Sequence, residues 1–191
     1  MAVGAFWLAK NLDDRQTKLE ASVLQFSILQ SDGTLSAASG VQTWAGTNKT
    51  AQDAFTVTAN STYRVRGQWL VNTGTTTHTT AIAFALSGAT VTDFQCLTTL
   101  WSAAANTIAT PQCTHMSGVA SKVISATSTA VYTIISLEGI MVIGTGGTVT
   151  PQVNFSANPT GTNLMKRGSW TSFEKLGSDT ATVIPVTGGW A

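Results

Sequence analysis

Apolar and polar side chains alternate over several stretches of this 191-residue chain. The clearest stretch is residues 62–71, where every second position is apolar or glycine and the positions between include two arginines. A period of two places alternate side chains on opposite faces of a β-strand. This segment therefore predicts a strand with one buried face and one polar face.

Other segments rich in β-branched and aromatic residues are separated by short runs of Gly, Asn, Asp, Ser and Thr, which are typical of turns. The pattern predicts about eight short strands and no internal helix, with residues 102–117 as a loop. Within residues 148–156, Pro151 indicates an edge strand or a bulge, because proline has no N–H to donate. The candidate strands are residues 23–29, 54–58, 62–71, 81–86, 94–101, 121–124, 131–143, 148–156 and 168–176.

Many short strands without helices favour an all-β fold, an antiparallel β-sandwich or jelly roll. We expect three parts: an N-terminal arm at residues 1–22, a jelly-roll domain at residues 23–177 and a C-terminal tail at residues 178–191. The start of the chain lacks the basic region of a signal peptide, and no apolar run is long enough to span a bilayer.

Two predicted strands have unusual faces. Residues 131–143 are apolar on both alternating faces, which predicts a strand covered on both sides. Residues 81–86 place Ala81, Ala83 and Ala85 on one face, and such a flat face admits a close neighbour, either a second sheet or another subunit.

The composition favours packing over chemistry. Charged residues make up only 10% of the chain, against about 25% in typical domains. From residue 67 to residue 165 the only charged residues are Asp93, Lys122 and Glu138. Together with 33 threonines, this indicates an all-β chain that hides surface in an oligomer; a secreted Thr-rich monomer is the alternative. The net charge of +1 argues against nucleic acid or a membrane as a partner.

Candidate catalytic and metal-binding residues are sparse. Cys96 and Cys113 are expected to be reduced thiols, although a disulfide stays open, and a zinc site formed by both cysteines with His115 is disfavoured. Asp93 and Glu138 would form a glycosidase pair only if they met; Glu138 is better interpreted as a buried acid satisfied by Arg64, Arg66 or backbone donors. We expect no enzyme activity and no cofactor.

Two further motifs have structural interpretations. The glycine-rich segment at residues 144–148 lacks the lysine of a phosphate-binding loop, so it predicts a hairpin turn. The six tryptophans divide by position: Trp69 and Trp170 are predicted core residues, Trp7 and Trp190 docking anchors, and Trp44 and Trp101 exposed residues able to stack on a sugar.

Three stretches resemble one family. They are residues 55–67 (Phe-Thr-Val-Thr-Ala-Asn-Ser-Thr-Tyr-Arg-Val-Arg-Gly), residues 81–88 (Ala-Ile-Ala-Phe-Ala-Leu-Ser-Gly), and residues 137–156, which begin Leu-Glu-Gly-Ile-Met-Val-Ile-Gly and continue to Arg167-Gly-Ser169. Together they resemble the jelly-roll virion proteins of tailed bacteriophages, over about residues 50–177. These proteins serve as capsid cement (decoration) or as tail-fibre tip domains, and are often trimers with a tumour-necrosis-factor-like fold.

The resemblance implies a homotrimeric cement protein on the capsid exterior, assembled in the host cytoplasm and bound to the major capsid protein. A tail-fibre tip that binds a host surface glycan is the alternative, and a glycan depolymerase is a third. On the first hypothesis the anchors to the capsid are Phe6, Trp7, Leu8 and Trp190. The expected trimer interface consists of Ala81, Ala83, Ala85, Ile135 and Leu137.

Overall fold

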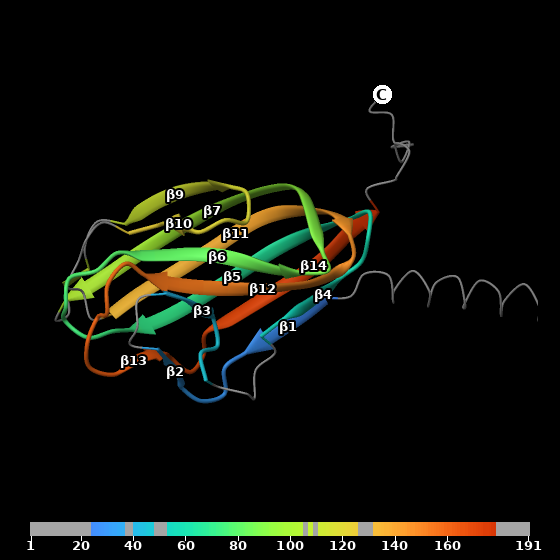
Figure 1. Ribbon diagram of the computed structural model, residues 1–191. Helices are drawn as coiled ribbons and strands as arrows, with labels where there is room; N and C mark the ends of the chain where they lie inside the picture. The colour runs from blue at the N-terminus through green and yellow to red at the C-terminus, as the bar shows by residue number, and fades with distance from the viewer. Residues whose placement is uncertain are drawn as a thin grey trace, which may run out of the picture.

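The computed structural model describes residues 24–36, 40–47, 53–104, 107–108, 111–125 and 132–178. These residues form two antiparallel β-sheets that stack face to face, and they contain no helix (Figure 1). The predicted all-β sandwich of jelly-roll type is confirmed. The proposed arm at residues 1–22, and residues 179–191 of the tail, lie outside the described residues.

The larger sheet has the strand order β1-β14-β5-β11-β7-β8. Strand β9 also pairs with β7, and β13 bridges β5 and β2. The bounds of its strands are β1 Leu24–Ile28, β2 Gly33–Leu35, β5 Ser61–Asn72, β7 Thr90–Ala104, β8 Thr107–Ile108, β9 Gln112–Ser117, β11 Tyr132–Thr145, β13 Asn163–Met165 and β14 Trp170–Ser178.

The smaller sheet has the order β10-β6-β12-β3, and β4 pairs with β12. The chain crosses between the sheets at the β5–β6, β6–β7 and β11–β12 connections, so strands that follow one another in sequence lie in different layers. The bounds of its strands are β3 Gly40–Thr43, β4 Phe55–Val57, β6 Thr80–Ser87, β10 Lys122–Val123 and β12 Gly147–Phe155.

Alternate side chains from both sheets fill the space between the layers, as the pleat of a sandwich requires. Aromatic pairs join the layers: Phe55 of β4 stacks on Phe173 of β14 with ring centroids 4.5 Å apart, and Trp44 stacks on Trp69 at 6.2 Å. Trp69 is fully buried, as predicted, and its Nε1–H donates to Thr171 Oγ1 at 2.9 Å. Trp44 is also fully buried, so its predicted role as an exposed stacking residue is wrong.

Part of the predicted loop at residues 102–117 is a strand. Strand β9 pairs antiparallel with β7, with Cys113 opposite Thr99 and Met116 opposite Cys96. Met116 is the only residue of β9 that is buried, while Cys113 and His115 are exposed. An edge strand with a single buried apolar side chain has almost no alternation, so its sequence resembles a loop.

Pro151 does not lie on an edge strand. Strand β12 is central, between β6 on one side and β3 with β4 on the other. Pro151 lies where that second neighbour changes, because β4 pairs with residues 147–149 and β3 with residues 152–155. The N–H that proline lacks therefore falls at a break in the ladder, where its loss costs little.

The glycine-rich segment does not form a hairpin: β11 ends at Thr145, β12 begins at Gly147, and only Gly146 lies between the two strands. Strand β11 belongs to the larger sheet and β12 to the smaller one, so the segment carries the chain across the sandwich. Gly147 lies close to the backbone that follows β6: a Cβ there would lie 2.3 Å from Ala89 N and 2.4 Å from Ser87 O. Only glycine fits this crossing without moving the backbone.

We expect Gly147→Ala to lower the free energy of unfolding by about 2 kcal/mol or more, because the added methyl group overlaps backbone atoms that cannot rotate away. The matched control is Gly177→Ala, because no atom lies within 4 Å of a Cβ at that position. Chemical denaturation of both variants checks the prediction, and equal midpoints for the two variants would contradict it.

Candidate interaction surface

The predicted trimer-interface residues of β11 are core residues. Ile135 and Leu137 are 0% and 3% exposed and pack in the hydrophobic core. Their side chains fill the space between the two sheets, so they are not available to a second copy of the folded chain. The expectation that these two side chains form the trimer interface is therefore corrected: the pleat directs them inward.

Ala81, Ala83 and Ala85 lie on the outer face of the smaller sheet, since Ile82 and Phe84 between them belong to the core. Ala81 and Ala83 are only 5% and 6% exposed, although no second sheet covers them. Longer side chains flank them on β12, where Asn154 and Gln152 are their register partners. The predicted anchors Phe6, Trp7, Leu8 and Trp190 lie outside the described residues.

The outer face of the larger sheet is the exposed apolar surface of this fold. Ten large apolar side chains among the described residues are exposed, and the strand registers place seven of them on this one face. We call it the outer apolar face; the seven are Leu24, Phe26 and Ile28 of β1, Leu97 of β7, and Tyr132, Ile134 and Ile140 of β11.

Strand β11 was predicted to be covered on both sides. Within a single chain only its odd-numbered side is covered: Ile134 is 39% exposed and Tyr132 is 54% exposed. The prediction is therefore wrong for the isolated chain. The apolar side chains that suggested a second cover belong to the outer apolar face.

Strand β1 presents its apolar side to solvent and its polar side to the interior. Phe26 is 51% exposed, whereas Ser27 is 5% exposed. The cause is Gln25, whose side-chain amide accepts from Thr56 N at 2.9 Å and donates to Thr56 O, both on the edge of β4. Because this amide supplies hydrogen bonds that β4 needs across the sandwich, the opposite side of β1 must carry Leu24, Phe26 and Ile28 outward.

Phe26 stacks on Trp170 of β14, with ring centroids 5.8 Å apart and the rings 29° from parallel. Trp170 is half-buried on the outer apolar face, so its predicted place in the core is wrong. Trp101 of β7 is also half-buried on this face, in an apolar row with Ile134 and Leu70 of the neighbouring strands.

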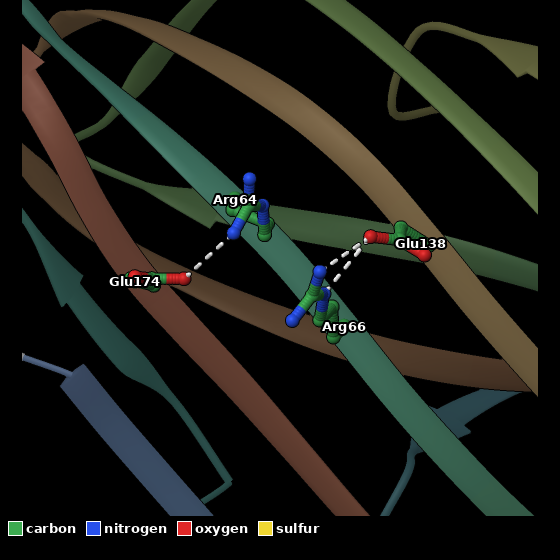
Figure 2. A network of polar contacts seen from close by, with 4 residues as sticks. All are labelled: Arg64, Arg66, Glu138 and Glu174. Atoms are coloured by element: carbon green, nitrogen blue, oxygen red, sulfur yellow. Dashed lines mark hydrogen bonds and ion pairs between the residues drawn. The ribbon is translucent and has the colours of Figure 1, made fainter.

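Two ion pairs occupy the middle of the face (Figure 2). Arg66 Nη2 lies 2.8 Å from Glu138 Oε1, and Arg64 Nη1 lies 3.4 Å from Glu174 Oε2. Glu138 was predicted to be a buried acid paired with an arginine; the partner is confirmed, but its side chain is 65% exposed. Exposed pairs of this kind contribute at most about 1 kcal/mol, so their main effect is to neutralise the face.

The face has relief as well as charge. A ridge formed by Glu138 and Leu97, register partners on β11 and β7, separates two open hollows. One hollow, of about 300 Å³, has Trp170, Gln68 and Ser136 in its lining. The other, of about 380 Å³, is lined by Arg64, His115 and Ile140 among others.

The candidate acids do not form a catalytic pair. Asp93 is the register partner of Val142, four residues along β11 from Glu138, so the two residues lie about 13 Å apart along the strand direction. Asp93 instead accepts from Gln95 Nε2 at 2.8 Å, and Gln95 Oε1 lies 2.8 Å from His115 Nε2. Over the residues described, no group of three or more His, Cys, Asp or Glu side chains is placed to bind a metal, and no helix is able to cross a bilayer.

The two cysteines lie on opposite faces of the larger sheet. Cys96 is 1% exposed and points into the core, whereas Cys113 is exposed on the outer side of β9. This geometry leaves both thiols free within one chain and prevents them from sharing a zinc ion with His115. Burial raises the pKa of the Cys96 thiol to about 12, so it stays protonated at neutral pH.

Comparison with known proteins shows no relative by sequence: no family model and no curated protein matches this chain. Five chains of solved structures match by shape. One belongs to "Structure of infectious bursal disease virus Gx strain", with 7% identity and a TM-score of 0.19. The match covers 80% of this chain and 40% of that chain, so this protein spans less than half of the viral one. At this TM-score the likeness carries no argument about function.

We expect one reactive thiol per folded chain. A maleimide at neutral pH should modify Cys113 alone, because Cys96 is buried and protonated. Unfolding in denaturant should expose a second thiol of equal reactivity. Intact-mass analysis checks both statements, and peptide mapping assigns the site. Modification of Cys96 in the folded chain, or a mass two protons lower from an intrachain disulfide, would contradict the structure.

Proposed function

We propose that this protein is a non-enzymatic structural subunit of a tailed-phage virion. It is a homotrimeric cement protein that clamps and stabilises the major capsid lattice from the capsid exterior. The observation that carries this proposal is the outer apolar face, which holds seven of the ten exposed large apolar side chains of the described residues. A face that gathers most of the exposed large apolar side chains marks a site of protein contact, and the resemblance of residues 55–67, 81–88 and 137–156 to phage virion proteins supplies the setting.

The two described ends of the chain support attachment through the arms. Strand β1 begins at Leu24 and pairs with β14, where Leu24 is opposite Glu174, and β14 ends at Ser178. Both ends of the described chain therefore lie at the same end of the sandwich (Figure 1). In the sequence, the proposed anchors Phe6, Trp7 and Leu8 precede β1, and Trp190 comes after β14.

The proposed mechanism is thermodynamic. A subunit that binds the assembled lattice, and not its dissociated parts, stabilises the lattice by mass action. At a free concentration one hundred times its dissociation constant, this amounts to about 2.7 kcal/mol for each site. The arms supply recognition of the major capsid protein, and the sandwich supplies contact between copies.

Deleting residues 1–10 should leave the trimer intact and abolish binding to capsids, because the deletion removes Phe6, Trp7 and Leu8 but no described residue. The measurements are light scattering for the mass and co-sedimentation with capsids that lack this protein. A matched control replaces Ala5 and Ala9 of the same arm by serine and should still bind. Loss of the trimer on deletion would contradict this division of roles.

The alternative is a fibre tip that binds a host surface glycan, favoured by one observation: the hollow beside Trp170 combines an aromatic wall with Gln68, Ser136 and Thr99. Copy number separates the two functions. We expect hundreds of copies in each particle, located on the capsid by electron microscopy. A few dozen copies at the tail would favour the fibre tip instead.

A further inference from the structure

We propose that the outer apolar face is the contact between copies of this chain, with the ridge of Leu97 and Glu138 on one copy entering a hollow on the next. The inference rests on the proposed function, since it names the face through which copies of the subunit meet. It also replaces the interface expected from the sequence, which consisted of Ala81, Ala83, Ala85, Ile135 and Leu137.

The distribution of apolar surface separates the two faces. The outer apolar face carries seven exposed large apolar side chains, in three groups on β1, β7 and β11. The outer face of the smaller sheet carries two, Val41 on β3 and Val123 on β10, and these lie on strands at opposite sides of that sheet. Only the larger sheet therefore offers an extended apolar surface for a partner to cover.

Charge on this face suits a copy of the same chain as the occupant, because that copy carries the same balanced set of charges. Strand β5 carries Arg64 and Arg66, while its neighbours β11 and β14 carry Glu138 and Glu174. The four charges sum to zero, so a strongly acidic or basic partner gains nothing here. A second copy that places its β5 against β11 of the first brings Arg66 opposite Glu138.

The same offset matches two further rows of the face. Leu70 is the register partner of Ile134, and Gln68 is the register partner of Ser136, so facing β5 with β11 of a neighbour sets apolar against apolar and polar against polar in these rows. In the row beyond Arg66, Arg64 faces Ile140, so the match does not extend over the whole face. Because β5 and β11 are adjacent strands, the same placement also sets β11 of the second copy against β5 of the first, so the contact is isologous and the pairing of Arg66 with Glu138 occurs twice.

The ridge and the two hollows of the outer apolar face allow a side chain of one copy to enter a depression on another. Leu97 is 54% exposed on the ridge, and the hollows on either side measure about 300 Å³ and about 380 Å³. Each hollow exceeds the volume of a leucine side chain, so a ridge residue of a neighbour can enter it. Arg66 and Glu138 line the first hollow and offer charged partners at its rim.

The test compares exposed aliphatic positions on the two faces of the full-length protein. Leu97→Lys and Ile134→Lys place a charge on the outer apolar face; Val123→Lys and Val41→Lys place the same charge on the opposite face. The four residues are 54%, 39%, 53% and 51% exposed, so each lysine stays solvated in the isolated chain. Leu97→Met retains an apolar side chain of similar volume and serves as the conservative control.

We expect the Leu97 and Ile134 lysine variants to raise the dissociation constant of the oligomer by about thirty-fold or more, the loss typical of a central interface residue. The Val123, Val41 and Leu97→Met variants should keep the wild-type mass. Sedimentation velocity over a concentration series gives the masses, and circular dichroism confirms that each variant is folded.

The possible outcomes are distinct. Dissociation by the Val41 or Val123 variants, but not by the Leu97 and Ile134 variants, would overturn this inference and leave the proposed function standing. If the wild-type protein is an oligomer that does not bind capsids, and Leu97→Lys dissociates that oligomer, the proposed function is overturned and this inference stands. A monomeric wild-type chain that binds a glycan, with binding lost in Leu97→Lys, would overturn both and identify the hollow as a sugar site.

Discussion

A two-layer sandwich covers one face of each sheet, and the other face must meet water or a partner. The rest of this structure depends on that constraint. The inward side chains of β5, β11 and β14 complete the core with those of β4, β6 and β12. Nothing in the described chain remains to cover the outward side chains of the larger sheet. The apolar side chains on that outward face are therefore the surface that we propose a second copy of the chain covers.

Strand β1 shows how a local polar contact fixes the direction of a whole strand. Its sequence, Leu-Gln-Phe-Ser-Ile, has an apolar set and a polar set, and burial of the apolar set would normally decide its orientation. Here Gln25 bonds to both backbone groups of Thr56, and those groups lie on the exposed edge of β4. Water would otherwise bond to these exposed groups, so the net gain from the Gln25 contacts is about 0.5–1.5 kcal/mol for each hydrogen bond. In an assembly that covers Leu24, Phe26 and Ile28, these apolar side chains of β1 would still be buried although they point away from the core of their own chain.

The sequence predicts the fold class and the longer strands because the period of two survives wherever a strand is buried on one side. It fails where that period is absent or misleading. Strand β9 has one buried side chain, so its alternation is invisible. Residues 131–143 are apolar on both faces, and the sequence alone does not tell which face packs against the second sheet of the same chain. The sequence therefore predicts that β11 makes an intermolecular contact, but it selects Ile135 and Leu137, the side chains that the core already uses.

Glu138 illustrates the same limit for electrostatics. A single acid within a long neutral stretch implies a partner, and Arg66 is that partner at 2.8 Å. The sequence does not show that the pair is exposed, because exposure depends on which face of β11 the core takes. In water the pair contributes little to stability. Once a neighbouring copy excludes water from the face, the same charges would interact in a medium of lower dielectric, where opposed like charges cost several kcal/mol. The alternation of Arg and Glu across β14, β5 and β11 then acts chiefly on register: it penalises wrong offsets between copies more than it strengthens the right one.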